Sequence, residues 1–257
     1  MIVSIEALLQ RLVRELLDDN TLAIGLTGSH ARGDANAHSD IDLWHFVRQM
    51  PEDPRAAYRL RMLDGWLVSV SVRELAGEAA LIRAPQTAIA VVPGFRQMRA
   101  LHDPQGELAQ VIEEARNFPW DSLRAAAADR AGYELCGNAE EVGKLLAALE
   151  QDADEMGLFW LHAMIFGLLN ATTLGLGLLV ETENTQVQRL QQTVGVDSAW
   201  SRALRQALGI PPAGAARRAR AGLRLYRETA ALLEGQLRPD DQAVVDATLQ
   251  RIEIVLN

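Results

Sequence analysis

The chain has 257 residues, of which 49% are apolar and 23% are charged, so it can bury a sizeable core and wholesale disorder is excluded. Acidic residues outnumber basic ones by 34 to 25, which gives a formal net charge of −9. That balance argues against a general nucleic-acid-binding protein, which needs a basic face, and suits a cationic small-molecule partner better. The single cysteine, Cys136, excludes a disulfide within the chain.

Up to about residue 118 the sequence alternates between helical and strand patterns. Apolar residues at helical spacing predict helices at residues 5–17, 55–62 and 106–117, with a short helix or turn at 30–32. Continuous or alternating apolar runs predict strands at residues 21–27, 41–47, 66–72, 88–92 and 98–102. This part of the chain is therefore expected to be a small mixed sheet with helices.

From Pro119 onward every periodic segment is helical, at residues 123–149, 156–179, 187–194, 199–208, 215–233 and 242–256. The change predicts two domains, 1–118 and 119–257, in an α+β protein whose second domain is an all-helical bundle. Residues 157–180 carry no charge and are long enough to cross a bilayer, but acidic residues flank them on both sides. We expect them to form the central buried helix of the bundle, in a cytoplasmic protein with no membrane partner.

The most informative stretch begins where the 21–27 strand meets Gly28-Ser29 and ends at Ser39-Asp-Ile-Asp42. Glycine lets a phosphate or another backbone approach closely, and the amides that follow it can donate hydrogen bonds to oxyanions. Asp40 and Asp42 are two residues apart on an extended segment, so their side chains project from one face. Two adjacent carboxylates repel each other unless a cation neutralises them, and hard oxygen ligands suit Mg²⁺.

Each part of this pattern is common when it occurs alone. A lone Asp-x-Asp is frequent in exposed strands and turns, and Gly-Ser after a strand is usually a turn. The ordered combination of strand, Gly-Ser, a loop and Ser-Asp-apolar-Asp is far more specific. It indicates a nucleotide site.

The sequence GSHARGDANAHSDIDLWHF resembles the signature of the DNA polymerase β-like nucleotidyltransferase superfamily, particularly the bacterial branch that contains kanamycin nucleotidyltransferase and streptomycin adenylyltransferase. The matching residues are Gly28, Ser29, Arg32, Gly33, Ser39, Asp40 and Asp42. The resemblance implies that Asp40 and Asp42 hold Mg²⁺ and are catalytic, that Gly28 and Ser29 hold the triphosphate, and that Ser39 lies beside it. Arg32 could pair with a phosphate oxygen or with Asp34, and the motif favours the phosphate.

The chain departs from the family at the third carboxylate, which usually lies on a later strand. The corresponding segment, WLVSVSV at 66–72, contains no acid, and Ser69 or Ser71 is expected in its place. Asp64 and Glu74 lie just outside the strand. Losing a general base costs about two to four orders of magnitude in rate. Another acid, such as Asp154 or Glu155, could substitute for it.

Two functions remain open on these grounds. The first is an enzyme that transfers a nucleoside monophosphate, expected to be AMP from ATP, with Mg²⁺ onto a hydroxyl of a small, aminoglycoside-like acceptor. The second is a catalytically degenerate protein of the same fold that binds nucleotide or a protein partner in a regulatory role.

Two other polar features have a simpler interpretation. His30 and His38 flank the nucleotide loop and are expected at its surface rather than against phosphate or acceptor. The arginines at 217, 218, 220, 224 and 227 are expected to form a solvated helix face rather than an RNA or triphosphate contact.

Overall fold

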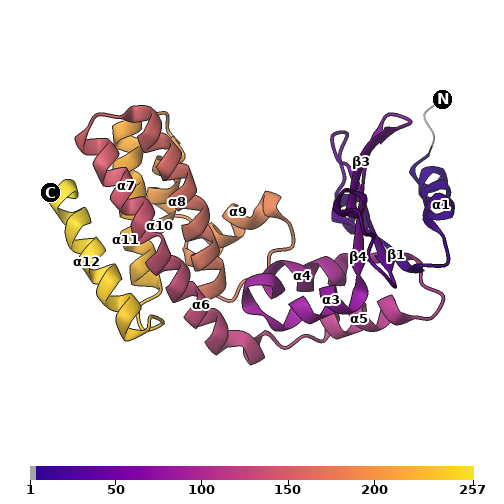
Figure 1. Cartoon of the computed structure of the whole chain (residues 1–257). Helices are drawn as coiled ribbons and strands as arrows, with labels where there is room; N and C mark the ends of the chain where they lie inside the picture. The colour runs from indigo at the N-terminus through magenta and orange to yellow at the C-terminus, as the bar shows by residue number, and fades with distance from the viewer. Residues whose placement is uncertain (1–3) are drawn as a thin grey trace. The chain divides into compact units, whose positions relative to one another are not determined.

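A computed structural model describes residues 4–257 of the chain (Figure 1). The chain divides into two compact units, one ending at Pro119 and the other running from Trp120 to Asn257. The predicted domain boundary between residues 118 and 119 implies that the two parts fold independently, and it stays a prediction.

The first unit contains a five-stranded sheet of order β3-β4-β2-β1-β5. Its strands are β1 (Thr21–Thr27), β2 (Ile41–Val47), β3 (Tyr58–Leu63), β4 (Trp66–Glu74) and β5 (Arg99–His102). β2 and β4 pair in parallel, whereas the other three pairings are antiparallel. The mixed sheet followed by a helical unit confirms the predicted α+β class.

Helices cover the two faces of this sheet differently. α1 (Ile5–Leu16) packs Leu8 and Leu12 onto a buried layer that includes Leu43 and Val70. The opposite face is covered by α3 (Leu75–Ala80), α4 (Pro85–Gln97) and α5 (Glu107–Arg116), as Figure 1 shows. Since side chains alternate along a strand, burying Leu43 under α1 turns Asp42 to the opposite face.

The helix predicted at residues 55–62 is wrong. A 3₁₀ turn (Pro54–Ala57) is followed directly by β3, whose apolar residues recur at every second position with arginines between them. Asp64 and Gly65 then adopt φ values of 50° and 86° and close a two-residue hairpin to β4. Asp-Gly favours this turn because both residues tolerate a left-handed backbone.

The strand predicted at 88–92 is also wrong, because these residues lie within α4. Ala88, Ile89, Val92 and Phe95 are buried at helical spacing, and Pro85 stands at the first turn, where its missing N–H costs nothing. Pro93 and Gly94, which separate the strands predicted at 88–92 and 98–102, lie inside this helix.

The second unit is entirely helical in the part that the structure describes. Its helices are α6 (Arg124–Gly137), α7 (Ala139–Glu150), α8 (Asp154–Gly175), α9 (Glu183–Val194), α10 (Ala199–Ala207), α11 (Ala215–Leu232) and α12 (Pro239–Leu256). The single helix expected at 123–149 is in fact two, α6 and α7, which meet at Asn138. The Asn138 side chain is buried and donates to the carbonyl of Glu134 at 2.7 Å, which satisfies a group at the end of α6.

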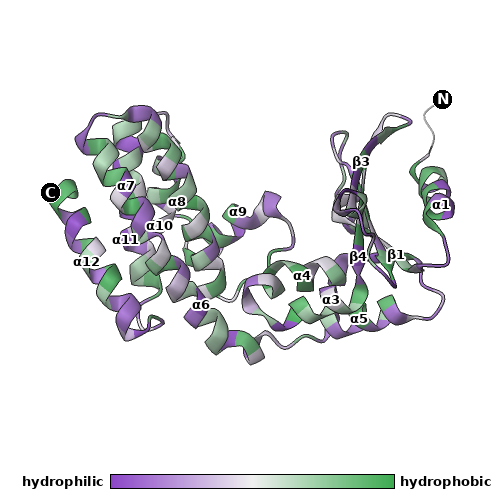
Figure 2. Ribbon diagram, in the orientation of Figure 1, coloured by the Kyte–Doolittle hydropathy of each residue, from purple (hydrophilic) through white to green (hydrophobic). Residues whose placement is uncertain are grey.

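α8 is the apolar helix singled out in the sequence, and Figure 2 shows apolar residues along most of it. Among residues 4–257 it is the one helix long and apolar enough to cross a membrane, and 56% of its most apolar window is buried inside the structure. It packs against α6, α7 and α11. The core helix of a bundle meets the same criteria of length and composition, so this finding does not establish a membrane span.

Candidate active site

The candidate site is built on the corner where β1 passes into α2 (Gly28–Arg32). Gly28 has φ +69°, and a Cβ placed on it would lie 2.4 Å from Oδ2 of Asp42. Only glycine therefore allows this corner to lie directly against the Asp42 carboxylate. The Gly-Ser corner was predicted to lie close to the acidic pair, and the structure places Gly28 beside Asp42.

Strand register fixes the position of Asp42. On β2 it pairs with Thr27 of β1 on one side and with Ser69 of β4 on the other. Ser69, which is 5% exposed, donates its hydroxyl hydrogen to Oδ1 of Asp42 at 2.6 Å. Of the two serines expected beside the acidic pair, the structure selects Ser69.

Several charges act on Asp42 at once. Burial raises the pKa of its carboxyl above the ordinary value, the hydrogen bond from Ser69 lowers it, and the negative charge of Asp40 raises it again. Electrostatic interactions with His30 and Arg32 lower it. Asp40, which immediately precedes β2 and is half-buried, is therefore close enough to Asp42 for the two carboxylates to repel each other.

The other predicted residues lie in the turn and loop between β1 and β2. Arg32 donates Nε to Oδ2 of Asp34 at 3.2 Å, and its Nη2 lies 3.2 Å from Oδ1, so the sequence alternative of an Arg32–Asp34 ion pair is formed. Ser39 Oγ accepts the backbone N–H of Asn36 at 2.9 Å. The carbonyl of Ser29 accepts the backbone N–H of Asp34 at 3.2 Å. The roles of Arg32, Ser29 and Ser39 toward a triphosphate stay predictions.

Neither acid next to the WLVSVSV strand replaces a third carboxylate at Asp42. Asp64 is bound by Arg11 Nη2 at 2.7 Å in the β3–β4 turn. Glu74 pairs with Val47, at the end of β2 opposite to Asp42. Within residues 4–257 no three or more His, Cys, Asp or Glu side chains are grouped so that they could hold a metal.

The donors that are present fit a hard cation. Asp40 and Asp42 offer only oxygen ligands, and their mutual repulsion would be relieved by a divalent ion. Mg²⁺ commonly binds one or two carboxylates and takes its remaining ligands from water and substrate phosphates. The two carboxylates beside the Gly28 corner therefore match the number of protein ligands that Mg²⁺ commonly takes.

His30 is the feature that the sequence analysis placed incorrectly. Its ring is half-buried, lies edge-on to Trp66 with centroids 5.6 Å apart, and acts electrostatically on Asp42. Its Nε2 is buried and has no hydrogen-bond partner among the residues that the structure describes. No sequence pattern indicates this burial, because the contact with Trp66 depends on the fold.

Comparisons with known proteins agree with this geometry. Residues 7–81 match the family model of the nucleotidyltransferase domain, a stretch that runs from within α1 to just past α3. Chains of known structure also match, among them a nucleotidyltransferase-like protein from Exiguobacterium sibiricum 255-15, with a TM-score of 0.52 and 13% identity over 96% of this chain and 78% of that one. A search of curated proteins found no match.

The family-model match over residues 7–81 supports the nucleotidyltransferase superfamily, and the structural match at 13% identity supports a nucleotidyltransferase-like fold. They do not single out the kanamycin and streptomycin branch. The matched domain supports a function in nucleotidyl transfer, and such domains typically use a nucleoside triphosphate and a divalent metal.

Proposed function

We propose that this protein is a Mg²⁺-dependent nucleotidyltransferase that moves a nucleoside monophosphate, AMP from ATP, onto a hydroxyl of a small acceptor. The observation that carries the proposal is the contact between the Gly28 corner and the Asp42 carboxylate, with Asp40 close by. It brings the two halves of the sequence motif together at one point, as nucleotide chemistry requires.

Each residue has a physical task in this proposal. Asp40 and Asp42 would hold Mg²⁺, which supplies charge stabilisation at the α-phosphoryl group. The hydrogen bond from Ser69 fixes the orientation of the Asp42 carboxylate. Ser29 and the amides around Gly28 would hold the triphosphate beside Ser39. Arg32 would exchange its ion pair with Asp34 for a phosphate oxygen.

The transfer itself needs a proton acceptor. The acceptor oxygen attacks the α-phosphorus, the bond to the bridging oxygen of the β-phosphate breaks, and pyrophosphate leaves. In the absence of a third acid beside Asp42 in the described residues, the proton of the attacking hydroxyl is assigned to His30, whose buried Nε2 has no partner there. The acidic net charge of −9 favours a cationic, aminoglycoside-like acceptor.

The direct test incubates the full chain with Mg²⁺, each nucleoside triphosphate and a panel of aminoglycosides and other hydroxylated small molecules. Pyrophosphate release and a mass increase of the acceptor by one nucleoside monophosphate are expected. Asp40→Ala should lower the rate by about a hundredfold or more, because the metal loses a ligand. Asp19→Asn, which changes an exposed acid outside the site, is the matched control and should leave the rate unchanged. Turnover that survives Asp40→Ala would reject the mechanism.

His30 is tested separately by His30→Gln. We expect a lower kcat with little change in the KM for ATP, because the variant loses the proton acceptor but no contact with ATP. An unchanged kcat would remove His30 from the mechanism without affecting the metal-binding role proposed for the aspartates.

A second candidate function is favoured by Ser69, which occupies the position beside Asp42 where the resemblance leads us to expect an acid. On this alternative the domain binds Mg²⁺ and nucleotide, turns over little, and acts through a protein partner. Calorimetric binding of Mg-ATP with no modified acceptor across the panel would favour it over the enzyme.

A further inference from the structure

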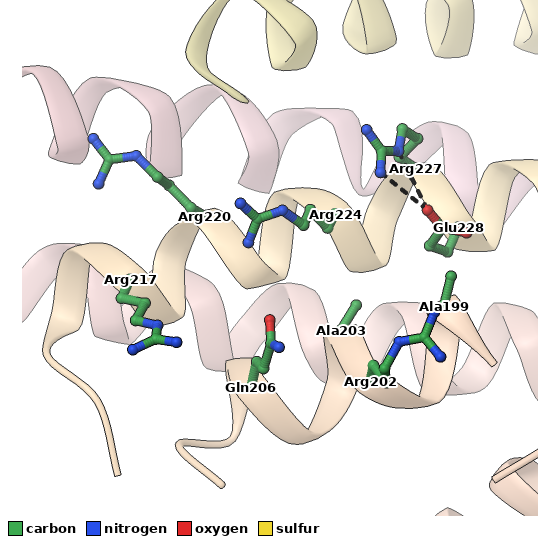
Figure 3. Close-up of a pocket in the computed structure, with 9 residues that line it drawn as sticks. All are labelled: Ala199, Arg202, Ala203, Gln206, Arg217, Arg220, Arg224, Arg227 and Glu228. Atoms are coloured by element: carbon green, nitrogen blue, oxygen red, sulfur yellow. Dashed lines mark hydrogen bonds and ion pairs between the residues drawn. The ribbon is translucent and has the colours of Figure 1, made fainter. Parts of the chain in front are cut away.

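A cavity of about 510 Å³ lies in the second unit, between α10 and α11. Five arginines line it, and we call it the arginine groove: Arg202 from α10, and Arg217, Arg220, Arg224 and Arg227 from α11 (Figure 3). From the sequence, the α11 arginines are expected to form a solvated helix face. Arg217 and Arg220 are exposed, as expected of such a face, and four of the α11 arginines also line one hollow together with Arg202 of α10.

The five arginines differ in whether another group of the described chain binds their guanidinium groups. Arg227 is neutralised by Glu228 and Glu253, each at 3.2 Å, and Arg202 donates to the carbonyl of Asp197. Within residues 4–257, Arg217, Arg220 and Arg224 have no carboxylate within 4.0 Å and make no hydrogen bond through their guanidinium groups.

Arg218 shows what a structural arginine does on the same helix. Its Nε donates to the carbonyl of Ala207 at 3.0 Å, and its Nη2 lies 3.3 Å from Nε2 of His162. It therefore satisfies the end of α10 and does not line the groove. Its neighbours Arg217 and Arg220 lack any comparable partner among the described residues.

Three guanidinium groups with no carboxylate partner among the described residues add positive charge to one side of α11, where Arg217 and Arg220 are exposed. Residues 217, 220 and 224 are spaced by three and four, so they lie along one side of α11, and like charges at these spacings destabilise a helix. The chain carries 34 acidic residues, yet among residues 4–257 Glu228 is the one acid that lines the groove. A concave surface with this excess of positive charge attracts and concentrates anions.

Several observations define the anion. Guanidinium forks match phosphate oxygens with paired hydrogen bonds. Seven residue steps, about 10 Å along the helix axis, separate Arg217 from Arg224, so a ligand with several phosphoryl groups matches the spread of the three guanidinium groups better than a single phosphoryl group. The volume is that of a small-molecule site, and none of the described side chains lining the groove is aromatic, as stacking of nucleic-acid bases would require.

We propose that the arginine groove binds a small polyphosphate anion with two or more phosphoryl groups, through Arg217, Arg220 and Arg224. Figure 3 shows Arg217 and Arg224 extending toward the space beside Gln206, whose amide offers a further donor. This site lies within the second unit and does not rest on the proposed nucleotidyl transfer.

The test is calorimetric titration of the full chain with inorganic tripolyphosphate in metal-free buffer at low salt, where a site that needs Mg²⁺ is silent. Arg220→Gln combined with Arg224→Gln should weaken binding by about tenfold or more, because two charge-assisted contacts are lost. Arg14→Gln combined with Arg251→Gln changes the net charge equally at two exposed arginines outside the groove. That control should keep the affinity within about twofold. Matching melting temperatures will show that all variants are folded.

Two further arms separate this site from the candidate active site and identify the ligand. Asp40→Asn combined with Asp42→Asn should retain tripolyphosphate binding, and orthophosphate should bind about tenfold more weakly than tripolyphosphate. Comparison of ATP with tripolyphosphate distinguishes a nucleotide from an inorganic polyphosphate as the source of the phosphates. The proposal is overturned by equal loss in the groove and control variants, by loss in the aspartate variant, or by equal affinity for orthophosphate.

Discussion

Gly28 and Gly33 both adopt a left-handed backbone, with φ +69° and +86°, but their surroundings differ. A Cβ on Gly28 would lie 2.4 Å from Oδ2 of Asp42, whereas a Cβ on Gly33 would meet nothing within 4 Å. Alanine at either position should cost about 1 kcal/mol of unfolding free energy for the positive φ. Gly28→Ala should also displace the Asp42 carboxylate and weaken divalent-metal binding by about tenfold or more, since a metal ligand moves.

Chemical denaturation and titration with Mg²⁺ check these two effects separately. Gly33→Ala serves as the matched control, because it has the backbone cost without the contact. Equal metal affinity in the two variants would mean that the corner and Asp42 are not in contact in solution.

The raised pKa of Asp42 predicts how stability and metal binding depend on pH. Its folded-state pKa lies above the ordinary value of 3.8, so ionisation of Asp42 destabilises the metal-free folded state, and this cost disappears as the pH falls through the folded pKa toward 3.8. Asp42→Asn should therefore raise the unfolding free energy at neutral pH, with a gain that shrinks on acidification. Denaturation between pH 7 and 4 measures it.

Ser69→Ala tests the hydrogen bond that lowers the pKa of the Asp42 carboxyl. Removing the hydrogen bond should raise the pKa of Asp42 further, so Mg²⁺ binding should be lost at a higher pH on acidification. Ser71→Ala is the control, since Ser71 pairs with Trp44 rather than with Asp42. A Ser69→Ala profile that overlays the unaltered one would contradict the assigned hydrogen bond.

At the scale of elements, the bounds of a strand were predicted best where the segment showed a single clear hydrophobic pattern. The β1 and β2 strands match their predicted bounds because each is a clear apolar run ended by polar or glycine residues. β3 was missed although Asp64-Gly65 is a strong hairpin signal and Tyr58, Leu60 and Met62 alternate with arginines. These apolar residues are exposed, so the pattern does not mark a buried face.

The candidate site was predictable only in part, for a related reason. The position of Asp42 beside Gly28 follows from local strand and corner geometry. The choice of Ser69 over Ser71 needs the parallel register of β2 and β4, which pairs residues 27 positions apart. The burial of His30 against Trp66 likewise depends on tertiary packing that no local pattern encodes.

At the scale of the whole molecule, each of the two units has its own buried core. Leu12 of α1 and Leu161 of α8 are both 0% exposed, one in each unit. Each alanine substitution should cost about 2 to 5 kcal/mol, the usual range for a fully buried leucine. We expect two calorimetric transitions, with Leu12→Ala lowering the midpoint temperature of one and Leu161→Ala that of the other. A single transition lowered equally by both would show that the chain unfolds as one cooperative domain, against the predicted boundary.

The pairing of Asp42 with Ser69 has a consequence for folding that is separate from catalysis. β2 and β4 are parallel neighbours, and a slip of one residue would turn Val68 and Val70 toward Asp42 and the serines toward the apolar layer under α1. The carboxylate would then be buried among methyl groups with no donor, at a cost of several kcal/mol. The same acid that is proposed to hold the metal thus selects the correct alignment of the two central strands, and a variant that lost it would lose a safeguard against misfolding as well as a ligand.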